Sequence, residues 1–215
     1  MWISLLAVGL GAVPLAYQSS AGFRMVLPAG FARSAEFHSQ PTAAAAPALP
    51  GVTVLLDSVF TDGSGPTASS IALALVDAPL VLDSGSSERV SALAIAYLHD
   101  QLSSDLHIEW VARVPAGSGE AMELAGRAEV DDQDRVAQFA FVPFGESQIV
   151  LTASLPSSRF AVLGPAIEKS LASLAFDQPI SKGPDRRAAL GAGIGALVGL
   201  LVVAARFFTR RERVS

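Results

Sequence analysis

Apolar and polar residues alternate with a period of two most clearly in two segments, residues 106–114 and 122–130. One segment presents Leu106, Ile108, Trp110, Ala112 and Val114 on one side, and the next presents Met122, Leu124, Gly126, Ala128 and Val130. Because successive side chains of a β-strand point to opposite faces, this alternation predicts strands that bury one face and expose the other to water. The sequence therefore predicts an antiparallel meander of strands at residues 106–114, 122–130, 135–142 and 147–155.

Earlier in the chain, the pattern predicts three further strands and a central helix. The strands lie at residues 23–27, 52–59 and 70–76. Residues 86–102 instead carry apolar side chains at helical spacing, namely Val90, Leu93, Ala94, Tyr97 and Leu98. The Ala- and Pro-rich residues 38–51 show neither period and predict a flexible loop.

A second helix is predicted within residues 157–176, after the meander. Its apolar stripe consists of Phe160, Leu163, Ile167, Leu171 and Leu174. Pro165 lacks a backbone N–H, so the sequence predicts that it lies near the first turn. We expect this helix to cover the apolar sheet face that Trp110 and Phe139 or Phe141 help to build.

These elements predict an α+β domain, an antiparallel sheet of about six strands packed by a central and a C-terminal helix. The stretches "GFRMVLPAGF" and "VLTASLPSSRFAVLGPAIEKSLASLAF" resemble the opening and closing signatures of the PsbP-like and DcrB-like domains. The resemblance covers residues 22–177 and implies an α/β/α sandwich whose relatives mostly bind or assemble with other proteins. It provides no catalytic residues, and the loop at 38–51 departs from it.

A membrane-spanning helix is predicted at residues 188–208. Ala188 to Ala205 are eighteen residues without a charge, which at about 1.5 Å per residue cross a bilayer core of about 30 Å. The alternative, a buried core helix, is disfavoured because soluble helices rarely exclude charge all round. Basic residues flank the span, namely Arg186, Arg187, Arg206, Arg210, Arg211 and Arg213. Residues 178–187 then form a linker and residues 209–215 a basic cytoplasmic tail.

Glycines within the span have two interpretations. Gly191, Gly195 and Gly199 recur every four residues, so they line one helix face that a second helix can approach closely. They would then mediate self-association. The alternative is that glycine is simply frequent in membrane helices. A nucleotide-binding loop does not fit, because no strand precedes these glycines and no βαβ unit surrounds them.

The distribution of charge along the chain and the apolar N-terminal segment give expectations about partners and cellular location. Residues 1–178 hold eighteen acidic and eight basic side chains, whereas residues 179–215 hold two acidic and seven basic ones. An acidic domain disfavours nucleic acid as a partner, while the basic tail suits an anionic inner leaflet. Residues 1–21 are apolar and resemble a secretory signal peptide without its leading basic residue. An uncleaved anchor and a first strand of the domain are the alternatives.

One motif raises an enzyme hypothesis. "LVLDSGSS" at residues 80–87 resembles the apolar-Asp-Ser-Gly element of aspartic proteases, in which two aspartates share a proton, so a dimer would need Asp83 from each chain. Because a helix is predicted directly afterwards, Asp83 or Ser84 more simply caps it. The three histidines and "DDQD" lack metal-ligand spacing, and the chain has no cysteine.

Charged residues on the meander, including Glu109, Arg113, Glu123, Arg127 and Glu129, are predicted to form cross-strand pairs on the solvent-exposed face. We therefore expect no catalytic, cofactor or metal site. The predicted function is a membrane-anchored binding or scaffolding domain, held outside the cytoplasm, with a protein partner of unknown identity. The same domain facing the cytoplasm on a tail anchor is the alternative.

Overall fold

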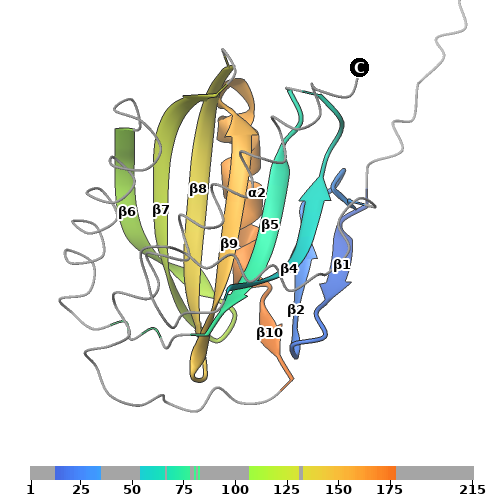
Figure 1. Ribbon diagram of the computed structural model, residues 1–215, viewed down its shortest axis with the longest axis vertical. Helices are drawn as coiled ribbons and strands as arrows, with labels where there is room; N and C mark the ends of the chain where they lie inside the picture. Colours follow the sequence, from blue (N-terminus) through green and yellow to red (C-terminus); the bar gives the residue numbers. More distant parts are fainter. Residues whose placement is uncertain are drawn as a thin grey trace, which may run out of the picture.

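The computed structural model describes residues 13–34, 54–65, 67–77, 80, 82, 107–130 and 133–177 (Figure 1). Within these residues, seven strands form one antiparallel sheet in the order β3-β4-β5-β9-β8-β7-β6. Their bounds are β3 Ala32–Arg33, β4 Val54–Thr61, β5 Ser70–Val76, β6 His107–Ala116, β7 Gly119–Val130, β8 Gln133–Phe144 and β9 Ser147–Pro156. The prediction of an α+β domain built on an antiparallel sheet is confirmed.

The meander occupies one half of this sheet, and its last strand joins the other half. β6, β7, β8 and β9 pair in chain order, as the alternation predicts. β9 then pairs with β5 along seven residues, from Ser70 opposite Ser154 to Val76 opposite Gln148. β9 therefore lies in the middle of the sheet, between β5 and β8.

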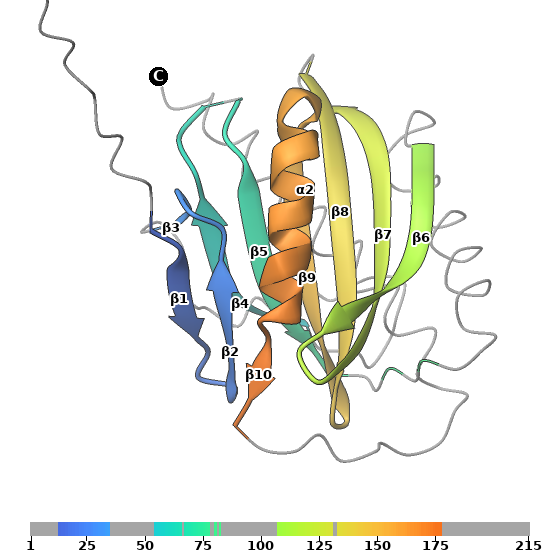
Figure 2. The same cartoon turned by 180° about the vertical axis from the view of Figure 1, so that it is seen from behind.

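A smaller sheet of three strands lies beside the helix (Figure 2). It consists of β1 Leu15–Gln18, β2 Phe23–Leu27 and β10 Ala175–Phe176, in the order β1-β2-β10. Residues 1–21 have three interpretations, namely a signal peptide, an uncleaved anchor and a first strand of the domain. The structure places Leu15–Gln18 of this segment in a strand of the domain. Tyr17 on this strand packs edge-on against Phe23 and Phe60, with ring centroids 6.3 Å and 5.0 Å away.

The helix α2, Ser157–Ala172, packs on one face of the large sheet (Figure 2). Leu163, Ile167 and Leu171 are buried in one cluster with apolar side chains of β2, β5, β8 and β9. The predicted apolar stripe of this helix is therefore confirmed. Pro165, however, lies in the middle of the helix and not near its first turn. Its exposed position keeps the proline ring outside the core.

The predicted covering of the sheet is wrong in its choice of face. Ala140, Val142, Ile149 and Leu151 face α2, whereas Phe139 and Phe141 alternate with Ala140 and Val142 and so point to the opposite face. Both faces of the central strands are buried, because Met122, Leu124, Phe139, Phe141 and Val150 are also inaccessible to solvent. The expectation of one solvent-exposed face fails for this part of the sheet.

An irregularity in β6 corrects a second detail. The register against β7 shifts between Ile108 and Trp110, so Glu109 is an extra residue without a partner across the ladder. A bulge of this kind reverses the phase of the alternation. Ile108 and Trp110 therefore face opposite sides of the sheet, although the sequence pattern predicts that they share one.

Several predicted elements lie outside the described residues. These are the loop at 38–51, the central helix at 86–102, the linker at 178–187, the span at 188–208 and the tail at 209–215. In the part of the chain that the structure describes, no helix has the length and apolar character needed to cross a membrane.

The hairpin between β6 and β7 is fastened to the end of α2. Gly117 in this hairpin has a φ of +57°, and its backbone N–H donates a hydrogen bond to the Leu171 carbonyl at 3.1 Å. A Cβ at Gly117 would lie 2.1 Å from the Leu174 carbonyl oxygen. The close approach of hairpin and helix end therefore requires glycine at this position.

Gly117→Ala should destabilise the protein by more than about 3 kcal/mol, since it combines left-handed backbone strain with a backbone collision. Gly145→Ala is the matched control, because Gly145 has a similar φ of +63° but nothing within 4 Å of its Cβ position. The control should lose only about 1–2 kcal/mol. The free energy of unfolding in urea measures both, and equal losses would contradict the proposed collision.

Candidate functional site

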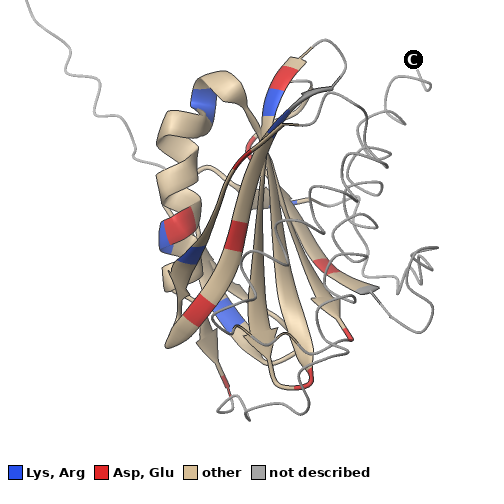
Figure 3. Cartoon of the chain, turned by 90° about the vertical axis from the view of Figure 1, so that its left-hand side faces the viewer, with Lys and Arg blue, Asp and Glu red and all other residues tan. Residues whose placement is uncertain are grey.

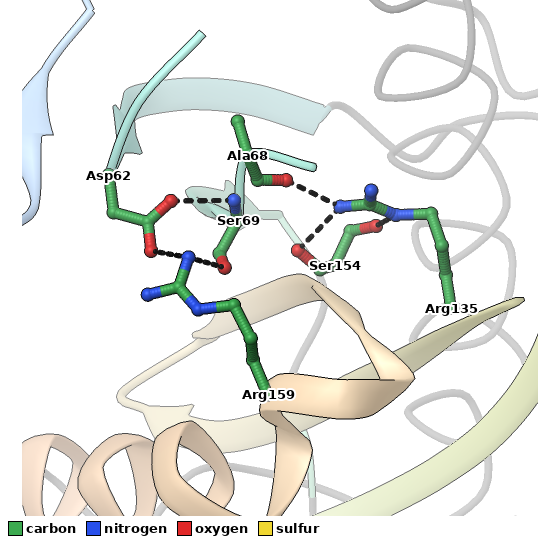
Figure 4. A network of polar contacts seen from close by, with 6 residues as sticks. All are labelled: Asp62, Ala68, Ser69, Arg135, Ser154 and Arg159. Carbon is green, nitrogen blue, oxygen red and sulfur yellow. Dashed lines mark hydrogen bonds and ion pairs between the residues drawn. The ribbon is translucent and has the colours of Figure 1, made fainter. Parts of the chain in front are cut away.

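The most extensive polar cluster among the described residues lies at one end of the large sheet (Figure 4). We call it the hairpin network, and it consists of Asp62, Ser69, Arg135, Ser154 and Arg159, with the carbonyl of Ala68. Asp62 follows β4, and its Oδ1 accepts a hydrogen bond from the Ser69 backbone N–H at 2.6 Å. The backbone N–H of Asp62 donates in turn to the Ser69 carbonyl at 3.2 Å. These bonds close the turn between β4 and β5.

Arg159 joins this turn to the first turn of α2. Its Nη1 lies 2.5 Å from Asp62 Oδ2 and donates to Ser69 Oγ at 3.2 Å. The Asp62 side chain is 4% exposed and that of Arg159 44% exposed. The helix has no side-chain N-cap and no acidic residue in its first turn. Asp62 therefore supplies a negative charge beside this helix start, where the helix dipole favours one.

Arg135 lies on the other side of the same turn and is buried. Its Nη2 donates to the carbonyls of Ala68 at 2.8 Å and Ser154 at 3.0 Å, and its Nε donates to Ser154 Oγ at 2.8 Å. Burial lowers the pKa of the Arg135 guanidinium, and the charge of Asp62 opposes that shift. The side chain stays charged, because arginine does not lose its proton in proteins near neutral pH. The hairpin network thus holds β5, β8, β9 and α2 together.

A second cluster attaches β1 to β4. The Tyr17 hydroxyl donates a short hydrogen bond to Asp57 Oδ2 and lies 2.9 Å from Ser58 Oγ. Ser19 Oγ donates to Asp57 Oδ1 at 2.9 Å. Asp57 is the bulged residue of β4, where the register against β5 shifts between Leu56 and Ser58. Burial and the bond to Asp57 raise the pKa of Tyr17, so this phenol is a proton donor and not a base.

A third cluster lies between the sheet and α2. Glu123 on β7 and Gln138 on β8 are both fully buried, and Gln138 Nε2 donates a short hydrogen bond to Glu123 Oε1. Burial raises the pKa of Glu123 to about 7; the bond to Gln138 opposes this rise, and the charge of Glu168 adds to it. The prediction that Glu123 belongs to the solvent-exposed charged set is therefore wrong.

Other charged residues of the meander, among those described, form exposed pairs. Arg127 lies 2.6 Å from Glu109, and Arg113 lies 3.4 Å from Glu120. Figure 3 shows basic and acidic residues interspersed over the described strands and helix. Exposed pairs of this kind contribute little to stability, about 0–1 kcal/mol each. Their effect is to keep the outer strands soluble.

The sequence-predicted site residues are not among those described. These are Gly191, Gly195 and Gly199, the flanking Arg186, Arg187, Arg206, Arg210, Arg211 and Arg213, and the protease candidate Asp83. Within the described ranges, no three His, Asp or Glu side chains gather closely enough to hold a metal ion. The three clusters were not predicted from the sequence, because their members lie between 7 and 90 positions apart.

Solved structures with the same fold are known. Cyanobacterial PsbP (CyanoP) from Synechocystis is 16% identical, covers 79% of this chain and 95% of its own, and has a TM-score of 0.53. A variant of Mog1 is 10% identical over 77% of this chain and 97% of its own, with a TM-score of 0.50. Mog1p of Saccharomyces cerevisiae, described as a Ran-binding protein, is 12% identical over 78% of this chain and 97% of its own, with a TM-score of 0.48.

No protein-family model matches the sequence, and no curated protein matches it. The structural likeness therefore defines the fold of the domain, a PsbP- and Mog1-like α/β sandwich. It confirms the PsbP-like part of the predicted resemblance at the level of the fold.

Arg159→Ala should destabilise the protein by about 1–3 kcal/mol, because it removes the cation from a nearly buried carboxylate. Lys169→Ala is the control, since Lys169 is an exposed cation on the same helix and its loss should cost under about 0.5 kcal/mol. Thermal and urea unfolding of the full-length variants measure the difference. If the two variants are equally stable, the hairpin network does not contribute to α2 docking.

Proposed function

We propose that this chain is a non-catalytic binding or scaffolding domain tethered to a membrane. The observation that carries the binding role is the fold that the domain shares with CyanoP and Mog1. Mog1p is described as a Ran-binding protein. The polar clusters of this domain support the non-catalytic part of the proposal, because their hydrogen bonds hold strands, turns and helix in place.

The uncharged residues 188–205 and the flanking arginines support the tether. The helix at 188–208 anchors the domain, and the basic tail 209–215 lies on the cytoplasmic side, where it faces anionic lipid. The bulk of the protein then lies outside the cytoplasm, with a protein as its partner.

A specific observation favours the opposite orientation as the second candidate. Cleavage before Gly22 would remove β1, and with it the Tyr17 and Ser19 contacts to Asp57. Retention of β1 in a mature protein agrees with a tail-anchored form whose domain faces the cytoplasm. The two orientations share the same tether and the same fold.

Cell fractionation with a tag at each terminus tests the proposal. The full-length protein should remain in the membrane fraction after an alkaline wash, whereas a variant that ends at residue 187 should be released. Protease added to intact cells should digest the domain and spare the C-terminal tag. A protected domain with an accessible C-terminus would show the tail-anchored orientation, and release of the full-length protein without detergent would refute the tether.

Self-association of the span is tested separately. Gly195→Ile should weaken cross-linking between copies in the membrane, because the side chain prevents close approach of two backbones. Gly193→Ile is the matched control, since Gly193 lies off the face formed by Gly191, Gly195 and Gly199. Loss of cross-linking in both variants, or in neither, would show that the glycines reflect composition only.

A further inference from the structure

Glu123 occupies an unusual position for a carboxyl group. It lies near the middle of β7, opposite Ala112 on β6 and Ala140 on β8. Residues directly opposite in an antiparallel sheet share a face, and Ala140 belongs to the core cluster that packs against α2. Glu123 is therefore enclosed between the sheet and the helix, and its side chain has no exposed surface.

The hydrogen bonds of this group are incomplete. Glu123 Oε1 accepts from Gln138 Nε2, but Glu123 Oε2 and Gln138 Oε1 have no hydrogen-bond partner within the protein. An ionised carboxylate has no donor to offer Gln138 Oε1. A protonated carboxyl has one, and when the two groups lie side by side the Glu123 hydroxyl can donate to Gln138 Oε1 while Gln138 Nε2 still donates to the other Glu123 oxygen. The pair can thus satisfy more of its atoms when Glu123 is neutral.

No cation on the described elements compensates the charge of Glu123. On β6 and β7, Arg113 pairs with Glu120 and Arg127 with Glu109. On β8, the Arg135 guanidinium binds the carbonyls of Ala68 and Ser154.

The helix presents a like charge. Glu168 on α2 acts on Glu123 and raises its pKa further. The cations of α2 do not offset this, since Arg159 pairs with Asp62 and Lys169 is exposed on the outer side of the helix. Ionisation of Glu123 therefore places a buried charge beneath the helix, close to the like charge of the exposed Glu168, and a buried charge without a partner is costly.

We propose that Glu123 is a proton-controlled switch for the docking of α2, which binds the sheet firmly when Glu123 is protonated and opens more often when it is ionised. The sign follows from the two pKa values. The carboxyl of the unfolded chain titrates near 4.5 and that of the folded protein near 7. Between these values the folded state binds more protons, so its stability falls as the pH rises through this window.

Hydrogen exchange of the α2 amides in the full-length protein in detergent micelles tests the switch. After correction for intrinsic exchange rates, the opening equilibrium of α2 should increase roughly 10- to 100-fold between about pH 5 and about pH 8. Glu123→Gln should abolish this increase, because glutamine has no proton to lose. Glu146→Gln is the control, since Glu146 is an exposed carboxylate in the turn between β8 and β9, and it should retain the increase.

An independent measurement covers the case in which Glu123→Gln does not fold. The carbon-13 signal of the Glu123 carboxyl in the wild-type protein should titrate near neutral pH. Titration below about pH 5 would overturn the proposal, since the charged form would then be tolerated beneath the helix. If the opening of α2 in the wild type does not depend on pH, the proposal is overturned as well. The same holds if Glu123→Gln shows the same pH dependence as the wild type.

Discussion

The fold depends on β9, a strand that must bury both of its faces. Ile149, Leu151, Ala153 and Leu155 face α2, while Val150 and Thr152 are buried on the opposite side. A strand in this position is paired along both edges, with β5 and with β8. Because its side chains are removed from water on two faces, it brings together the core beneath α2 and the apolar surface behind the sheet. The other strands take their places relative to it.

The burial of both faces also restricts where polar side chains of the sheet can find hydrogen-bond partners. At the strand ends they can reach turns and helix termini, and there Asp62, Arg135 and Arg159 form the hairpin network. In the middle of the sheet a polar side chain finds only the neighbouring strand. Glu123 has Gln138 as its hydrogen-bond partner for this reason. The position that makes this carboxyl costly when charged also makes the helix interface above it sensitive to protonation.

Sequence patterns predicted the regular strands well, because alternation is a local property. The bounds of β2 and β5 agree with the predicted 23–27 and 70–76. Which face of a strand packs against the helix, in contrast, depends on parts of the chain that are distant in sequence. Glu123 alternates with Met122 like any solvent-facing residue, and only the position of α2 places it inside. β3 and β10 are two residues each, too short for a periodic signal. β1 was concealed within an apolar segment that also resembles a signal peptide, and the bulge at Glu109 has no sequence mark.

The central claim is the pairing of β9 with β5, and engineered cysteines test it most directly, since the chain has none of its own. Ala74→Cys with Val150→Cys replaces residues that lie directly opposite, at a separation typical of disulfides. This pair should form a disulfide in the folded protein. Ala74→Cys with Leu151→Cys, shifted by one residue, should not, because its side chains point to opposite faces. Equal cross-linking of both pairs, or cross-linking of the shifted pair alone, would contradict this account of the fold.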